Sequence, residues 1–256
     1  MLNKILAVAI AFCLLLPLNS WGQQEEMIAG AAASTEITEL FFEHFQQSAA
    51  CADYNFKVMA TPIRHKSGVL TTNRFIFGRT GYPLTEQERN MGKEQILLGK
   101  IGLQIAVGLE TNVAQIKLQQ LEQVFTRKIT NWKELGGNDA QIMLIGKEQA
   151  DPSFTSLQKE YPFFALAQFD KIIKYDNETS KFLRTPQGAH SIAFGAKPNF
   201  NHYNHITVDG FSAAIPVGLA YDAKNEQLPV VKAAKDYAAS ADWKKLVKTI
   251  DALPIE

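Results

Sequence analysis

Short apolar runs alternate with segments of helical periodicity along this chain, which is the pattern of an α/β fold. Apolar residues recur at helical spacing over 37–45 and 118–125. A strand followed by a tight loop of small residues is expected over 26–33. The composition of other stretches is typical of strands, and these lie at 55–61, 73–77, 101–109, 142–145, 205–208 and 215–221. Two helices are expected at the C-terminal end, the second with Asp242 as its N-cap and Trp243 on its buried stripe.

The first 22 residues have the layout of a secretory signal peptide. Lys4 precedes an apolar run, and Ser20 and Gly22 lie three and one positions before an expected cut at Gln23. The run is shorter than a membrane-spanning helix usually needs, and no later segment is apolar enough to cross a bilayer. We therefore expect an exported protein, with an uncleaved membrane anchor or a lipidated Cys13 as the alternatives.

Charge and cysteine content narrow the function of the mature chain. Removal of the signal peptide leaves about 234 residues, enough for two lobes, with 25 basic and 26 acidic side chains. This near-neutral balance predicts neither nucleic acid nor an anionic membrane as a partner. Cys51 is the remaining thiol, so neither an internal disulfide nor a cysteine-based zinc site is expected.

Motifs that would indicate catalysis or a cofactor are absent from the sequence. There is no Gly-x-Ser-x-Gly, no His-Glu-x-x-His and no phosphate-cradling Gly-rich Lys loop. His202 and His205 are three residues apart, but no third metal ligand accompanies them. We expect a binding protein with no cofactor and no metal, rather than an enzyme.

One segment carries a specific resemblance. Residues 125–137 read Phe-Thr-Arg-Lys-Ile-Thr-Asn-Trp-Lys-Glu-Leu-Gly-Gly. This segment resembles the F-x-G-K-I-T-N-W turn, followed by two glycines, of the phosphate-type periplasmic binding proteins of ABC transporters. The small-residue loop 30–35, the turn 82–85 and the element 208–210 are similar to other parts of that family.

The resemblance implies a type II periplasmic binding protein fold, in which two α/β lobes joined by crossing hinge strands close over a ligand. Lobe one is expected at 24–105 plus 207–256 and lobe two at 106–206. The implied function is the capture of a small oxyanion in the periplasm, with phosphate as the first candidate. The resemblance also implies an ABC permease as a candidate partner and a monomeric mature chain. The alternative is an accessory or sensor protein with the same fold but without high-affinity phosphate transport.

The resemblance also implies where the ligand binds. A tetrahedral oxyanion needs many hydrogen-bond donors, which helix N-termini supply as free backbone N–H groups. The implied ligand-binding residues come from the start of the first helix, the end of a strand and the loop before a lobe-two helix. They are Ser34, Thr35, Arg79, Thr80, Gly81, Lys147, Asp151 and Ser153.

The lobe-two loop departs from the family pattern. Ala150, Asp151 and Pro152 occupy the positions of the family's Gly-Ser-Gly, and Phe154 occupies the position of its anion-binding Arg. Pro152 has no N–H to donate. Asp151 would repel phosphate at close range unless it accepts a proton from the ligand. A purely structural alternative also exists, in which Ser34, Asp151 and Ser153 cap helices and Lys147 is a solvated charge.

Overall fold

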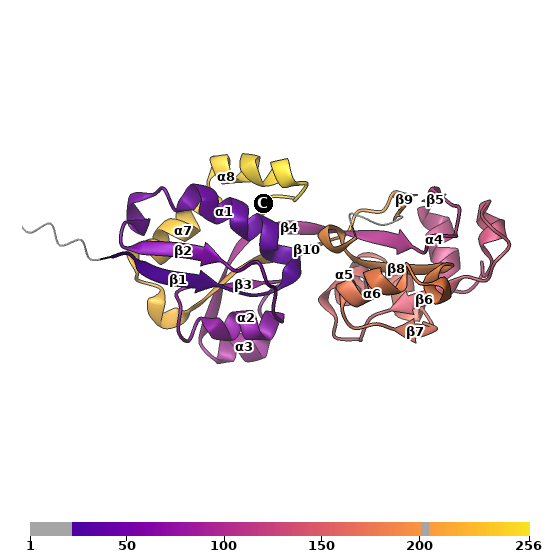
Figure 1. Cartoon of the computed structure of the whole chain (residues 1–256), viewed down its shortest axis with the longest axis horizontal. Coiled ribbons are helices and arrows are strands. Elements are labelled where there is room, and N and C mark those ends of the chain that lie inside the picture. Colours follow the sequence, from indigo (N-terminus) through magenta and orange to yellow (C-terminus); the bar gives the residue numbers. More distant parts are fainter. Residues whose placement is uncertain (1–21, 201–204) are drawn as a thin grey trace, which may run out of the picture.

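The computed structural model describes residues 22–200 and 205–256, which form two lobes joined by long strands (Figure 1). The expected signal peptide and His202 fall outside the described residues, apart from Gly22. Within the described part of the chain, no helix has both the length and the apolar character needed to cross a membrane.

Lobe one surrounds the parallel pair β1 (Gln24–Ile28) and β2 (Tyr54–Val58), which α1 (Thr35–Phe45) connects. Its other elements are β3 (Gly78–Thr80), α2 (His65–Thr71), α3 (Glu86–Asn90), α7 (Pro229–Ala239) and α8 (Ala241–Leu246). Rings from α1, α7 and α8 pack together, with Phe41 in contact with Tyr237 and Trp243. Full burial of each such side chain contributes about 1.5–3 kcal/mol.

Two long strands connect the lobes. β4 (Lys93–Val107) pairs antiparallel with β10 (Ala214–Asp222) along 93–102 and then with β8 (Ser191–Ala196) along 103–107. The resulting sheet has the strand order β3-β10-β4-β8-β6-β7 and continues from one lobe into the other. The sequence predicted only the second half of β4, since residues 93–100 mix charged with apolar side chains.

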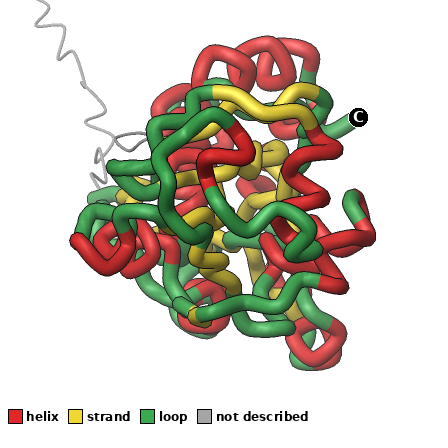
Figure 2. Tube along the Cα trace, turned by 90° about the vertical axis from the view of Figure 1, so that its right-hand side faces the viewer, coloured by secondary structure: helices red, strands yellow, loops and turns green. Residues whose placement is uncertain are grey.

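Lobe two is built around the inner strands β6 (Met143–Gly146) and β8, which are parallel and buried. Its other elements are β5 (Gln115–Lys117), β7 (Lys171–Ile172), β9 (His205–Asp209), α4 (Leu118–Phe125), α5 (Pro152–Glu160) and α6 (Asp176–Phe182). Viewed along the long axis, most strands lie inside and the helices lie around them (Figure 2). The core includes four side chains that are each at most 1% exposed, those of Phe125, Phe154, Phe164 and Phe194.

The prediction of a strand at 73–77 was wrong. The strand is β3, which begins at Gly78, and the preceding residues form turns after the unpredicted helix α2. Helix propensity is low in α2 because Gly68 lies at its centre. A Cβ on Gly68 would lie 2.6 Å from both the Arg79 carbonyl oxygen and the Gly30 Cα, so only glycine allows α2 to approach these two segments.

The predicted N-cap of the last helix was also wrong. Ser240 holds the N-cap position of α8, and its Oγ accepts the Trp243 N–H at 3.1 Å, whereas Asp242 lies in the first turn. The serine is the cap because its short hydroxyl reaches the amide three residues ahead.

This cap predicts a difference between two substitutions in α8. Ser240→Ala is expected to lower the free energy of unfolding by about 1 kcal/mol, because the Trp243 N–H loses its acceptor. Asp242→Ala should cost about 0.3–1 kcal/mol, through the helix dipole alone. Urea denaturation of both variants measures this, and a larger loss for Asp242→Ala would contradict the assignment.

Candidate functional site

The cleft wall of lobe one begins at the N-terminus of α1. Ser34 occupies the N-cap position and is fully buried, but its Oγ donates to the Ala31 carbonyl at 3.1 Å and does not cap the helix. Thr35 is the first residue of α1, and within the described chain no N-cap side chain accepts from the first turn. The Thr35 N–H already donates to the Ala32 carbonyl, but no N-cap side chain neutralises the positive end of the helix dipole, which therefore remains open to an anion.

Arg79 of β3 lies beside this helix start. Its side chain is fully buried, and its Nη2 donates to the Gly30 carbonyl at 3.3 Å. Neither Nε nor Nη1 has a hydrogen-bond partner among the described residues. Burial lowers the pKa of the guanidinium, against an opposing effect of Glu39 on α1. An arginine stays protonated in proteins, so this is a buried positive charge with free donors.

Thr80 and Gly81, the other two predicted ligand residues at this strand end, already make hydrogen bonds within lobe one. The Thr80 hydroxyl donates to the Gly218 carbonyl and accepts from the Gly218 N–H, both at 3.0 Å. The Gly81 N–H donates to Nδ1 of His65 at 3.1 Å. Both residues therefore support the strand end and do not present free donors to the cleft.

The wall of lobe two carries an ion pair. Lys147 follows β6 and is 2% exposed; its Nζ lies 2.7 Å from Asp176 Oδ1 and donates to Thr179 Oγ1 at 3.1 Å. The other carboxylate oxygen of Asp176 accepts from the Ala196 N–H and from the side chain of Asn199. The Lys147 charge is thus already neutralised by a carboxylate.

Asp151 and Ser153 together form the start of α5. Asp151 Oδ1 accepts from the backbone N–H groups of Ser153 at 2.9 Å and Phe154 at 3.2 Å. Burial raises the pKa of the Asp151 carboxyl, while Lys147 and these two amides lower it. In the described chain, no hydrogen bond reaches Oδ2, so this oxygen can still accept from a ligand.

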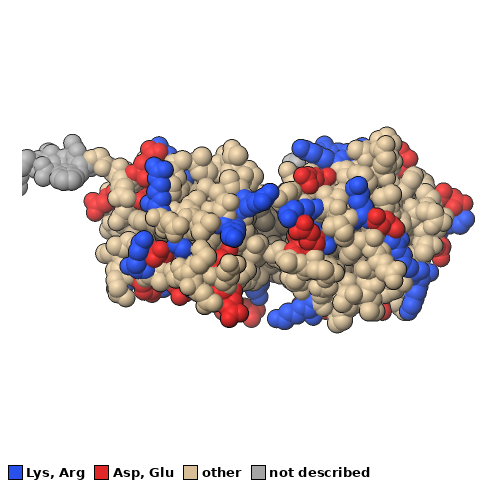
Figure 3. Space-filling model, turned by 90° about the horizontal axis from the view of Figure 1, so that it is seen from below, with Lys and Arg blue, Asp and Glu red and all other residues tan. Residues whose placement is uncertain are grey.

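Sequence reasoning missed the side chains that meet across the cleft. Arg64, the N-cap of α2, lies over the ring of Tyr175, the N-cap of α6, at 5.7 Å. The charge of Asp151 also contributes to a raised pKa of Tyr82, after burial and Glu88. Seen from below, the surface is hollowed between the lobes, with basic and acidic side chains on its sides (Figure 3). Arg64 and Tyr175 match no motif, and only the fold brings them together, whereas Tyr82 belongs to the turn 82–85 and Asp151 to the predicted site.

No cluster of three metal-ligating side chains occurs within 22–200 and 205–256. Among these residues, the site instead combines one buried cation without a carboxylate partner, one helix N-terminus without a side-chain cap and one free carboxylate oxygen. This combination can bind a small anion, particularly one that carries a proton for Asp151.

Solved structures similar to this one include a transport protein and an effector-binding domain. One is a candidate phosphate ABC transporter substrate-binding protein from Clostridium perfringens with bound phosphate (TM-score 0.63, 18% identity, 91% of this chain and 100% of that chain). Another is the effector-binding domain of QuiR in complex with shikimate (TM-score 0.54, 16% identity, 85% and 96%). This likeness confirms the predicted two-lobed α/β fold.

Sequence comparison gives the family. The phosphate-binding protein PstS of Bacillus subtilis is 28% identical over 127 residues, which is 49% of this chain and 39% of that protein. The chain thus matches about two fifths of the length of this curated relative, and the relative is named as a binding protein, not as an enzyme. The sequence profile described as "PBP superfamily domain" matches residues 27–246. The chain belongs to the PBP superfamily.

Proposed function

We propose that this chain is an exported solute-binding protein that captures a small oxyanion, with phosphate as the first candidate, and delivers it to an ABC permease. The superfamily membership and the phosphate-binding name of its Bacillus relative support this proposal. In this proposal the mature chain begins at Gln23, is monomeric and works in the periplasm.

The observation that carries the proposal is the state of Arg79. A fully buried guanidinium with two unpartnered nitrogens is costly, because a charge removed from water needs a partner. An anion at the start of α1 would supply that partner and would also lie at the positive end of the helix dipole. The chain thus carries a cost that ligand binding would relieve.

Asp151 favours a protonated oxyanion. Its Oδ2 can accept a hydrogen bond but cannot donate one while the carboxyl is ionised. Phosphate carries a proton near neutral pH and sulfate does not, so sulfate would meet only repulsion at this oxygen. We propose Ser34, Thr35, Arg79 and Asp151 as ligand-binding residues. Thr80, Gly81, Lys147 and Ser153 then support the site from behind, by the bonds described above.

We also propose where the lobes divide. β4 changes its partner from β10 to β8 between Gly102 and Leu103, and the chain returns between β9 and β10, at 210–213. Lobe one would then contain 24–102 and 214–256, slightly different from the limits expected from the sequence.

A second candidate function is an accessory or sensor protein for an organic anion. Lys147 is already paired with Asp176, so it adds no net positive charge to the lobe-two side of the site. The shikimate complex of the QuiR domain shares the fold, so an organic carboxylate is a reasonable probe of this alternative.

Calorimetric titration separates these two functions. The mature protein, starting at Gln23, is titrated with phosphate, sulfate, molybdate, tungstate and shikimate. We expect phosphate to bind and sulfate to bind at least ten-fold more weakly, because one repulsive contact of about 1.4 kcal/mol gives that factor. Binding of shikimate alone would favour the sensor. Binding of none of the inorganic anions at millimolar concentration would exclude the oxyanion function.

A further inference from the structure

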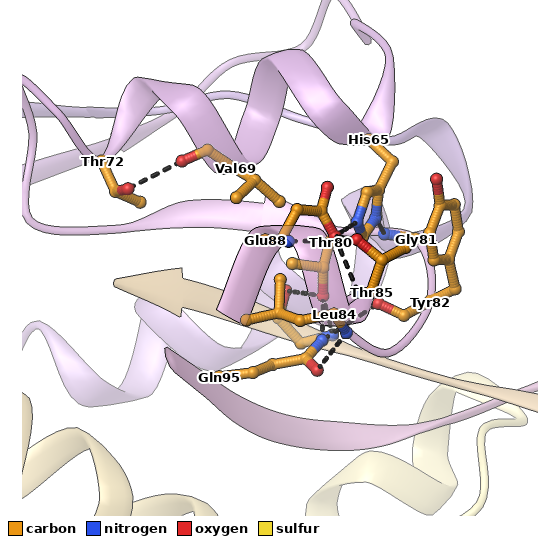
Figure 4. Close-up of polar contacts among 11 residues, drawn as sticks. His65, Val69, Thr72, Thr80, Gly81, Tyr82, Leu84, Thr85, Glu88 and Gln95 are labelled. Carbon is orange, nitrogen blue, oxygen red and sulfur yellow. Dashed lines mark hydrogen bonds and ion pairs between the residues drawn. The ribbon is translucent and has the colours of Figure 1, made fainter. Parts of the chain in front are cut away.

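A buried histidine lies directly behind the proposed binding loop. His65 is the first residue of α2 and is 5% exposed. Its Nδ1 accepts the Gly81 N–H at 3.1 Å, and its Nε2 lies 3.3 Å from Glu88 Oε2 (Figure 4). The imidazole thus joins α3 to the residue that follows Arg79 and Thr80.

The hydrogen bonds fix the protonation state of the ring. A backbone N–H can only donate, so Nδ1 must be without a proton to accept from Gly81. The single proton of the neutral ring is then on Nε2, which donates to Glu88. A protonated imidazole has hydrogen on both nitrogens and could not accept the Gly81 N–H.

The partners of His65 are themselves held in place. Glu88 Oε2 also accepts from the N–H and the hydroxyl of Thr85, each at 2.9 Å, in the capping box of α3. The Tyr82 ring stacks on the imidazole at 3.5 Å between centroids and 10° between planes. Even a methyl group on Gly81 would lie 2.6 Å from the Ala31 Cβ, so the two binding loops of lobe one abut at this point.

The surroundings of His65 favour the neutral ring. Burial lowers its pKa, and Glu88 raises it through its charge and hydrogen bond. The pKa of Glu88 is lowered by its bonds to Thr85 and by His65, despite the opposite effect of burial. Glu88 from α3 and the uncharged ring of Tyr82 face the imidazole, and Asp151 of lobe two acts on Tyr82.

We propose that His65 is a positioning residue of the oxyanion site, which holds Gly81, and with it the Arg79 strand end, in the binding geometry only while Nδ1 is unprotonated. This inference rests on the proposed function. It makes ligand release a consequence of acidification. When Nδ1 takes up a proton, the Gly81 N–H loses its acceptor, and the end of β3 next to Arg79 loosens together with Tyr82.

Three variants of the mature protein test this by phosphate titration between about pH 4 and pH 8, a range extended to low pH because burial lowers the pKa of His65. In His65→Asn the amide oxygen can still accept from Gly81 but does not titrate. In His65→Phe the ring and its stacking on Tyr82 are kept, but the acceptor is lost. His44→Asn, on the exposed side of α1, is the matched control. The affinity of each variant is divided by that of the wild type at the same pH, which cancels the protonation of phosphate itself.

We expect His65→Phe to bind phosphate on the order of ten-fold more weakly at pH 8, the factor for one lost hydrogen bond of about 1.4 kcal/mol. Its affinity ratio should rise towards one only as His65 becomes protonated, because the wild type then loses the same bond. Since burial lowers the pKa of His65, this rise should come below the usual histidine value of about 6.5. His65→Asn should gain affinity relative to the wild type over the same range, and His44→Asn should stay at a ratio of one. Ratios for both His65 variants that do not change with pH would overturn the proposal.

A ligand-free measurement separates this proposal from the proposed function. In ¹⁵N NMR of the free protein, Nδ1 of His65 should have the shift of an unprotonated nitrogen, and the Gly81 amide should titrate together with the ring. The Gly81 amide of His65→Asn should not titrate. If no oxyanion binds, the proposed function fails, and this titration alone decides the role of His65. A Gly81 amide that ignores the ring's protonation would overturn the role.

Discussion

Arg79→Met should weaken phosphate binding on the order of 10- to 150-fold and, at the same time, make the ligand-free protein more stable. The loss of affinity follows because a charged hydrogen bond in a site shielded from water is worth about 1.5–3 kcal/mol. The gain in stability follows because the guanidinium is fully buried and two of its nitrogens have no partner within the described chain. An apolar side chain of similar length removes that cost, and replacements of this kind stabilise by up to about 4 kcal/mol.

A loss of phosphate affinity combined with a gain in stability of the ligand-free protein identifies Arg79 as a binding residue. A purely structural arginine would lose stability when replaced, and an exposed one would change neither quantity. Calorimetric titration gives the affinity, and thermal denaturation without ligand gives the stability. Arg89→Met, on the exposed side of α3, is the matched control and should leave both unchanged. An Arg79→Met protein that is less stable but binds phosphate normally would remove Arg79 from the site and leave the structural explanation.

The sequence predicted the fold well where each local signal had a single solution. The segment 130–137 is such a case: Asn131 caps the turn, Glu134 returns a bond to the Asn131 N–H, and Gly136 takes the left-handed conformation at φ 83°. The helix 118–125 was predicted at its observed limits because its apolar residues keep helical spacing. Local chemistry determines both elements, so local patterns reveal them.

The site was less predictable because its geometry depends on contacts between distant residues. The sequence gives no sign that Asp176 neutralises Lys147, which lies 29 positions earlier, or that His65 accepts from Gly81. Helix α2 was missed because Gly68 lowers its propensity, and the requirement for Gly68 comes from Arg79 and Gly30. Residue types at a loop can thus suggest an anion site, but only the packing determines which donors remain free.

Trp132→Ala is expected to lower the free energy of unfolding by about 3–5 kcal/mol, the range for removing a large buried aromatic ring. The ring is fully buried in lobe two, and its Nε1 donates to the His190 carbonyl at 2.7 Å just before β8. Removing it leaves a cavity, and the His190 carbonyl keeps only the longer bond from the Met143 N–H, at 3.3 Å. For a chain of this size, the expected fall in Tm is about 6–20 °C.

Two further variants separate the causes of that loss. Trp132→Phe keeps most of the ring but removes the bond to His190, and should cost about 1–3 kcal/mol. Lys133→Ala, at an adjacent exposed position, should stay within about 0.5 kcal/mol of the wild type. Urea denaturation of the ligand-free protein measures all three. An unchanged midpoint for Trp132→Ala would mean that the ring does not hold this turn against β8. The similarity to phosphate-type binding proteins over 125–137 would then lack the structural role that we assign to it.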